Sequence, residues 1–134
     1  MQVFTSLGRY APQMLAILRI VTALIFIAHG TQKLFGFPAP PASGLPAMFT
    51  LLWFGAILEL VGGLLILVGF LTRPVAFILA GEMAVAYWMF HAPSNFYPAL
   101  NGGDAAILFC FVFLYLAARG AGPFSIDNSR NRAL

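Results

Sequence analysis

The placement of charge constrains this chain most. Ionisable side chains lie in or beside four hydrophobic stretches that are otherwise almost free of charge. They are Arg19, His29, Lys33, Glu59, Arg73, Glu82, His91 and Asp104. A charged group at bilayer depth is costly unless it is paired or wetted, so such groups usually face the protein interior and have a function there. The pattern therefore predicts an integral membrane protein with a polar interior.

The composition excludes most other classes of protein. Hydrophobic residues make up 61% of the 134 residues and charged residues 8%, whereas about 25% of residues are charged in a typical soluble domain. The seven basic residues are scattered, which argues against a nucleic-acid partner. The single cysteine, Cys110, cannot form a disulfide within the chain. We expect the lipid bilayer to be the main partner of this protein.

Apolar runs and the Gly and Pro residues between them predict an all-α integral membrane fold, a four-transmembrane-helix up-and-down bundle. The expected helices cover roughly 13–35, 48–71, 75–91 and 104–119. The connections are short, so neighbours in sequence should pack together. The whole chain, 1–134, is then one membrane domain.

The arginines predict the orientation of the bundle. The loops 36–47 and 92–103 contain no Lys or Arg, whereas the opposite ends of the helices do. By the positive-inside rule, the arginine-bearing ends lie in the cytoplasm. We therefore expect a multi-pass protein with both termini cytoplasmic.

Several polar side chains form a candidate ligand-binding site in the outer half of the bundle: His29, Gln32, Lys33, Glu59 and Asp104. Glu59 is the strongest candidate, because a carboxylate in mid-membrane is expensive and His29 is available as its partner. Each residue also has a structural interpretation. His29 could be a buried hydrogen-bonding residue, Lys33 could extend to the interface, and Asp104 could favour the start of its helix.

Other residues are expected to hold the bundle together. Arg19 and Glu82 lie at similar expected depths and are predicted to form a structural ion pair. Small residues allow helices to approach closely, and those predicted to do so are Gly55, Gly62, Gly63, Ala80 and Ala84. Glu82 and His91 are nine residues apart, which places them on opposite sides of an α-helix unless it kinks.

Several motifs resemble those of the DoxX family of small four-helix membrane proteins: LRIVTALIFIAHGTQKLFGF, ELVGGLLILVGFLTR, the NGGD before the last helix and the closing GAGPFSID. The resemblance implies a bacterial inner-membrane location and a link to quinones and to oxidative or thiol stress. Carried over by position, it implies roles for His29, Gln32, Lys33, Glu59, Glu82 and Asp104, with Gly62 and Gly63 as packing residues. Asp104 departs from the family, which often has Glu there.

Three functions remain open from the sequence. The first is a membrane subunit of a quinone-linked oxidoreductase, in which a carboxylate and a histidine bind a quinone and transfer protons. The second is a structural or assembly protein without an active site, and the third is a pathway for small solutes or protons. The chain has no motif for an electron carrier, so a redox function needs a partner protein, and a pathway needs a homo-oligomer. We expect no metal and no covalently bound cofactor, with haem ligation by the two histidines as the alternative.

Overall fold

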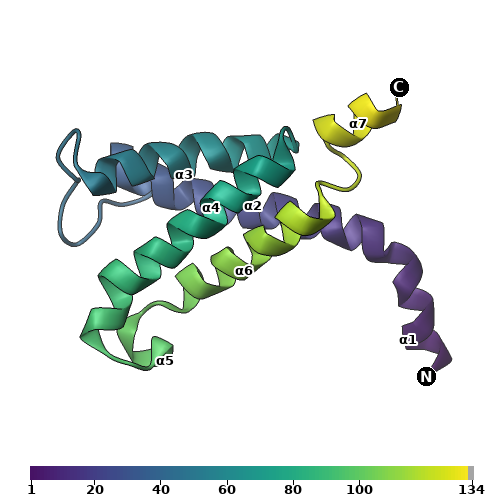
Figure 1. The fold of residues 1–134 in the computed structure, drawn as a ribbon, viewed down its shortest axis with the longest axis horizontal. Coiled ribbons are helices and arrows are strands. Elements are labelled where there is room, and N and C mark those ends of the chain that lie inside the picture. The colour runs from purple at the N-terminus through teal and green to yellow at the C-terminus, as the bar shows by residue number, and fades with distance from the viewer. Residues whose placement is uncertain (133–134) are drawn as a thin grey trace.

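The computed structural model describes residues 1–132, which are helical apart from the connections between helices (Figure 1). The long helices are α2 (Ala11–Phe35), α3 (Leu51–Val68), α4 (Thr72–Ala86) and α6 (Asp104–Arg119). The short ones are α1 (Gln2–Ser6), η1 (Leu7–Tyr10), η2 (Tyr87–His91), η3 (Ala92–Ser94), α5 (Pro98–Asn101) and α7 (Ile126–Arg132). The prediction of an all-α fold is confirmed.

Three helical segments are long and apolar enough to cross a membrane: Gln2–Phe35, Leu51–Val68 and Thr72–Ser94. α6 has 16 residues, which makes it about 24 Å long at 1.5 Å per residue. It lies against α4 along its length. The fold is therefore that of an integral membrane protein, as the sequence predicts, with one helix shorter than the other three segments.

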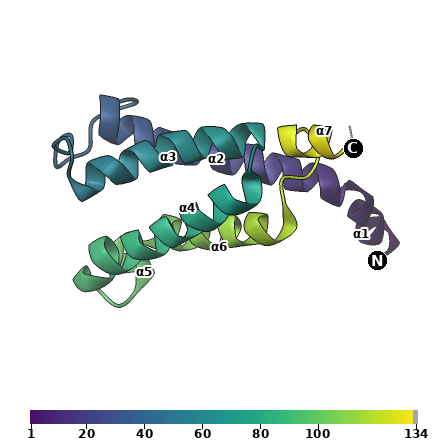
Figure 2. The same cartoon turned by 45° about the horizontal axis from the view of Figure 1, so that its top comes forward.

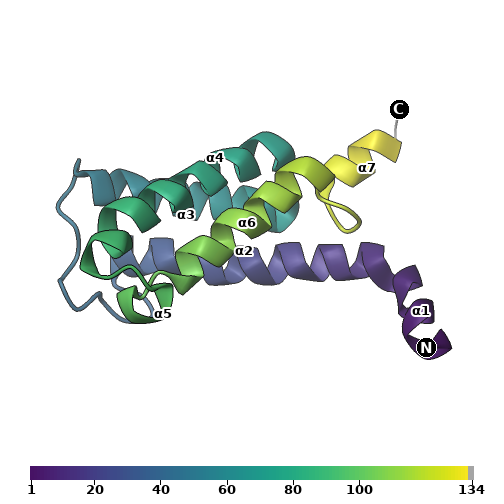
Figure 3. The same ribbon diagram turned by 60° about the horizontal axis from the view of Figure 1, so that its bottom comes forward.

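The four long helices form two hairpins. α2 packs along α3, and α4 packs along α6. The hairpins approach each other near the turn between α3 and α4 and diverge toward the loops at the far end, as two views of the ribbon show (Figures 1 and 2). A third view shows α6 crossing obliquely over α2 (Figure 3). The bundle is therefore open at the end that carries the loops 36–50 and 92–103.

Three of the long helices begin at other residues than the sequence predicts, and α2 begins at Ala11 rather than at 13. α3 begins at Leu51 rather than at 48, because the side chain of Thr50 accepts a hydrogen bond from the backbone N–H of Trp53 and so caps the helix. α4 begins at Thr72 rather than at 75, because Asp127 accepts hydrogen bonds from the backbone N–H groups of Leu71 and Thr72. A carboxylate there satisfies N–H groups that have no partner within the helix.

Asp127 fastens the C-terminal segment to the bundle. Burial raises the pKa of this carboxyl group, but the hydrogen bonds from Thr72 and Leu71 and the charge of Arg130 outweigh it and hold the pKa below its usual value. The carboxylate therefore stays ionised at neutral pH. The negative charge also lies at the N-terminal end of α4, where the helix dipole stabilises it.

The end of the third membrane segment is not a regular α-helix. After Ala86 the chain makes a π-helical turn, η2, and then a 3₁₀ turn, η3. A π turn inserts one extra residue into the helix, which rotates the following side chains by about 100° relative to an α-helix. The irregular turn is the exception under which Glu82 and His91 can share a side, and both line one cavity.

Small residues of α3 contact two different helices. A Cβ atom added at Gly62 would lie 2.8 Å from Leu79 of α4, and one added at Gly63 would lie 2.6 Å from Ile27 of α2. A larger residue at either position would force the neighbouring Leu79 or Ile27 side chain to move, so the two glycines allow the helices to approach closely. Gly30 of α2, which the sequence analysis did not select, lies equally close to the backbone of α3. Of the two predicted alanines, Ala80 is buried and Ala84 is half-buried.

An aromatic cluster joins the two hairpins. The ring of Phe26 in α2 packs edge-on against Phe109 and Phe113 of α6, with centroid distances of 5.3 and 4.9 Å. Phe26 and Phe113 are fully buried. Lipid tails are as apolar as these rings, so the cluster stabilises the bundle by close packing of its side chains rather than by their removal from water, and it is a main contact between α2 and α6.

Candidate functional site

A cavity of about 760 Å³ lies between α3 and α4, on the side where the hairpins diverge. The loop that follows α2 covers its outer end, with residues such as Pro41 and Leu45. Its rim includes Phe54, Ile78 and Val85, which are 53, 54 and 51% exposed. These apolar side chains would face lipid, so the cavity opens toward the bilayer. Its polar side chains include Lys33, Glu59, Glu82 and His91, which we call the polar group of the cavity.

Lys33 and Glu59 form an ion pair between α2 and α3. The Nζ atom of Lys33 donates to both carboxylate oxygens of Glu59, at 2.8 and 3.0 Å. The side chain of Glu59 is 4% exposed and that of Lys33 is 26% exposed. Both residues are among the predicted site residues, but the predicted partner of Glu59 was His29. That assignment is wrong.

His29 points elsewhere because of helical geometry. Gly30 faces α3, and consecutive residues of a helix are about 100° apart. The ring of His29 therefore does not face α3. It packs edge-on against Phe109 of α6, with a centroid distance of 5.9 Å. His29 is exposed and does not line the cavity.

Two further predicted site residues also lie outside this cavity. Gln32 is half-buried on α2. Asp104 is the first residue of α6 and is exposed. An acidic residue in the first turn of a helix is stabilised by the helix dipole, which matches the structural interpretation of Asp104. The structure therefore places two of the five candidate residues in the cavity.

Glu82 is part of the polar group rather than of an ion pair. Its Oε1 atom lies beside Gly55, 3.3 Å from where a Cβ atom would be. Its Oε2 atom is buried and has no hydrogen-bond partner among the residues that the structure describes. A buried carboxyl oxygen without a partner is uncommon, and such an atom calls for an explanation beyond packing.

His91 reaches the cavity because of the π turn. It is half-buried, and its Nδ1 atom lies 3.1 Å from the backbone carbonyl oxygen of Asn101. Asn101 is itself fixed, because its amide donates to Tyr87 and to the carbonyl of Asn95. These contacts hold the ring in place. His91 is not among the site residues that the sequence predicts, and the one signal for it is that a kink in its helix would bring it to the side of Glu82.

The predicted ion pair between Arg19 and Glu82 does not form. Arg19 is fully buried, and its five hydrogen bonds, 2.5–3.2 Å long, go to the carbonyl oxygens of Ile66, Leu67, Ala121, Pro123 and Phe124. Glu82 lies beside Gly55, eleven residues before Ile66 and so about 16 Å away along α3. The prediction failed because α4 begins earlier than expected, which places Glu82 deeper in the bundle.

The polar group can donate and accept hydrogen bonds and exchange protons. Lys33 offers donors only, Glu59 and Glu82 offer carboxyl groups, and His91 is an acid–base group. A cavity of this size, mostly apolar with a few polar groups, is typical of small-molecule sites. Within the part of the chain that the structure describes, no three His, Cys, Asp or Glu side chains come together as a metal site requires.

Comparison with known proteins gives the family. The DoxX family model matches residues 14–92. An uncharacterized protein of Haemophilus influenzae is 42% identical over 127 residues, which cover 92% of this chain and 95% of that protein. The inner membrane protein YqjF of Escherichia coli is 35% identical over 120 residues, with coverage of 85% and 89%. The inner membrane protein YphA of E. coli is 29% identical over 140 residues, with coverage of 92% and 95%.

No solved structure matches this chain. Both named relatives are inner membrane proteins, and the apolar helices of this chain agree with the same location in a bacterium. The family match and these relatives extend over the segments that form the cavity. The chain belongs to the DoxX family of membrane proteins.

Proposed function

We propose that this protein is a small membrane subunit of a quinone-linked redox system, and that the cavity between α3 and α4 holds the quinone head group. A single observation carries the proposal. The cavity combines an apolar rim, open to the bilayer, with a polar group that includes the unpartnered oxygen of Glu82. A quinone has the matching chemistry, since its ring and tail are apolar and its carbonyl oxygens accept hydrogen bonds.

The residues of the polar group would have different tasks. Lys33, with three N–H donors, would donate to a quinone carbonyl while it remains paired with Glu59. Glu82 has no ion-pair partner among the described residues, so it would take up and release the protons that accompany reduction of a quinone to a quinol. The two electrons would come from a partner protein. That partner supplies the electron carrier that the sequence lacks.

We expect the quinone retained by the purified protein to fall about tenfold in Gly81→Leu. Gly81 lines the cavity, and a Cβ atom added there meets no other atom within 4 Å. A leucine would therefore occupy the cavity without forcing the helices apart. The measurement is the ratio of quinone to protein after purification in detergent, determined by extraction and chromatography.

Two control variants keep the test specific. Gly8→Leu makes the same change at another position with free space around it, and His29→Ala removes a histidine that lies outside the cavity. Both should retain quinone at the wild-type level. If wild type retains no more quinone than Gly81→Leu, the proposal is wrong and the structural or assembly function is preferred.

The orientation of the bundle belongs to the same proposal. The arginine-bearing ends, with both termini, would face the cytoplasm, and the cavity would lie near the outer surface. We expect Ser43→Cys, in the loop after α2, to react with a membrane-impermeant thiol reagent added to intact cells. Ser129→Cys in α7 should react only after the cells are opened, and both variants should be made in a Cys110→Ala background. The opposite labelling pattern would reverse the orientation.

A further inference from the structure

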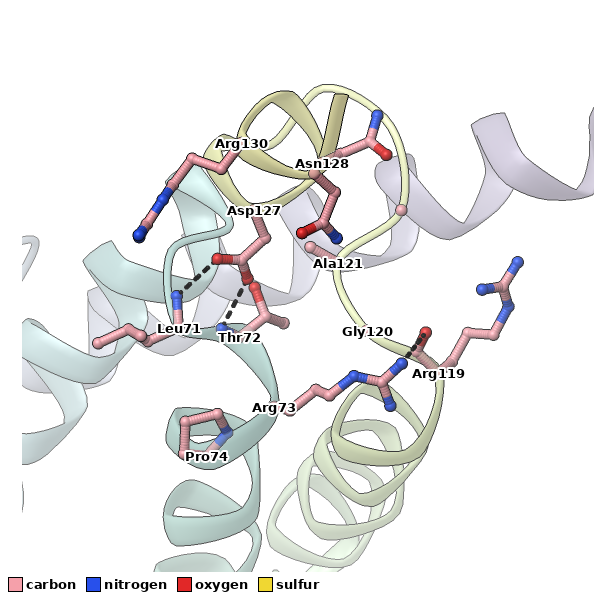
Figure 4. A pocket seen from close by; sticks show the side chains of 12 residues that line it. Leu71, Thr72, Arg73, Pro74, Arg119, Gly120, Ala121, Asp127, Asn128 and Arg130 are labelled. Atoms are coloured by element: carbon pink, nitrogen blue, oxygen red, sulfur yellow. Dashed lines mark hydrogen bonds between the residues drawn. The ribbon is translucent and has the colours of Figure 1, made fainter. Parts of the chain in front are cut away.

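A second cleft, of about 500 Å³, lies at the opposite end of the bundle from the polar group. The turn before α4, the end of α6 and the segment that leads into α7 surround it (Figure 4). Its lining includes three arginines, Arg73, Arg119 and Arg130, and one carboxylate, Asp127. The proposed quinone site uses none of these residues.

The positive charge of the cleft is only partly compensated from within. Both oxygens of Asp127 accept backbone hydrogen bonds, from Leu71 and Thr72 (Figure 4). Arg73 donates to the carbonyl oxygens of Ala117, Ala118 and Arg119 at the end of α6. The cleft therefore carries three guanidinium groups and one carboxylate, and each oxygen of that carboxylate already accepts a backbone hydrogen bond.

Arg119 and Arg130 remain available for a ligand. Both are exposed, and their side chains start at opposite edges of the cleft and point away from each other (Figure 4). Among the described residues, neither side chain forms a hydrogen bond or an ion pair with a carboxylate within 4.0 Å. The Arg130 guanidinium lies over the ring of Phe70, 5.6 Å from its centroid. A guanidinium group whose N–H groups have no other partner can donate two parallel hydrogen bonds to two oxygens of one phosphate.

The surroundings of the cleft favour a lipid as the source of the phosphate. The cleft lies at the ends of membrane-spanning helices, at the level of lipid head groups. Leu71 on its wall and Phe124 in the neighbouring linker are 48 and 77% exposed, and both are apolar. Basic pockets between transmembrane helices bind anionic head groups in this way.

We propose that this cleft binds a phosphate-bearing anion and that the head group of an anionic phospholipid supplies it. Arg119 and Arg130 are exposed and swing onto the phosphate when the lipid binds, while the acyl chains lie against Leu71 and Phe124. Arg73 caps the C-terminal end of α6 and contributes its positive charge to the cleft. The bound lipid would then join α7 and the linker before it to the two hairpins.

The test measures binding of phosphatidylglycerol to the purified full-length protein by native mass spectrometry in detergent, with phosphatidylcholine as the neutral comparison. We expect preferential binding of phosphatidylglycerol, and a loss of about fivefold in its affinity in Arg119→Gln and in Arg130→Gln. Arg9→Gln is the matched control. It removes the same charge from an exposed arginine at the same end of the bundle but outside the cleft.

A competition arm separates the two sources of phosphate. Millimolar inorganic phosphate is added to the lipid-bound wild type and to lipid-bound Arg119→Gln. If it displaces the phospholipid from wild type but not from Arg119→Gln, the cleft binds free phosphate as well. If inorganic phosphate has no effect, the head group is the ligand. The proposal is overturned if the two phospholipids bind equally, or if Arg9→Gln loses as much affinity as the cleft variants. Thermal unfolding of each variant shows whether it remains folded.

Discussion

Replacing Arg19 by lysine is expected to lower the free energy of unfolding by about 3 kcal/mol. The guanidinium uses all five of its N–H groups on carbonyl oxygens of α3 and of the linker after α6. A lysine has three donors and cannot reach in two directions at once. At least two buried carbonyl groups then lose their partner, and each costs about 1–3 kcal/mol.

Unfolding by sodium dodecyl sulfate, added to the protein in a mild detergent and followed by circular dichroism, measures this change. Arg9→Lys is the matched control, because Arg9 is exposed and contacts the ring of Tyr10. It should change the unfolding free energy little. If Arg19→Lys and Arg9→Lys have the same free energy of unfolding, the hydrogen bonds of Arg19 contribute little to stability.

The second large effect is expected at the ion pair of the cavity. Lys33→Met should destabilise the protein by about 3–5 kcal/mol, because it leaves the carboxylate of Glu59 buried without a counter-charge. The double variant Lys33→Met/Glu59→Leu should recover most of this loss, since replacing both partners by apolar groups is often nearly neutral. The same unfolding titration compares the two variants.

Gln32→Met provides the control for this experiment. It introduces the same side chain one position earlier on α2, outside the cavity and outside the ion pair, and should have a small effect. If Lys33→Met is no less stable than Gln32→Met, the pair does not hold α2 to α3. If the double variant is as unstable as Lys33→Met, the loss comes from packing rather than from a stranded charge.

The helices could be predicted closely from the sequence, and the side chains that meet could be predicted only in part. The apolar runs and the Gly residues after them give the end of α2 at Phe35 and both ends of α6. The glycines of α3 face other helices as their spacing suggests. These features are local and follow from helix geometry and residue size.

The cavity could not be predicted, because it depends on features that lie outside that geometry. A π turn brings His91 to the side of Glu82, and no periodicity based on 3.6 residues per turn includes it. The partners of Arg19 are backbone carbonyl groups, which carry no mark in the sequence. Pairing side chains by charge alone therefore predicts the wrong partner for Arg19, which was paired with Glu82. It also predicts the wrong partner for Glu59, which was paired with His29.

The contacts of Arg19 also have a consequence for the order in which this protein is completed during synthesis. Arg19 leaves the ribosome with the first hairpin, which includes the carbonyl groups of Ile66 and Leu67. Its three other acceptors, at Ala121, Pro123 and Phe124, are made after α6. Until those acceptors are made, three of the five N–H donors of Arg19 have no carbonyl partner in this chain. The first hairpin completes the contacts of Arg19 only after the segment that follows α6 has been made.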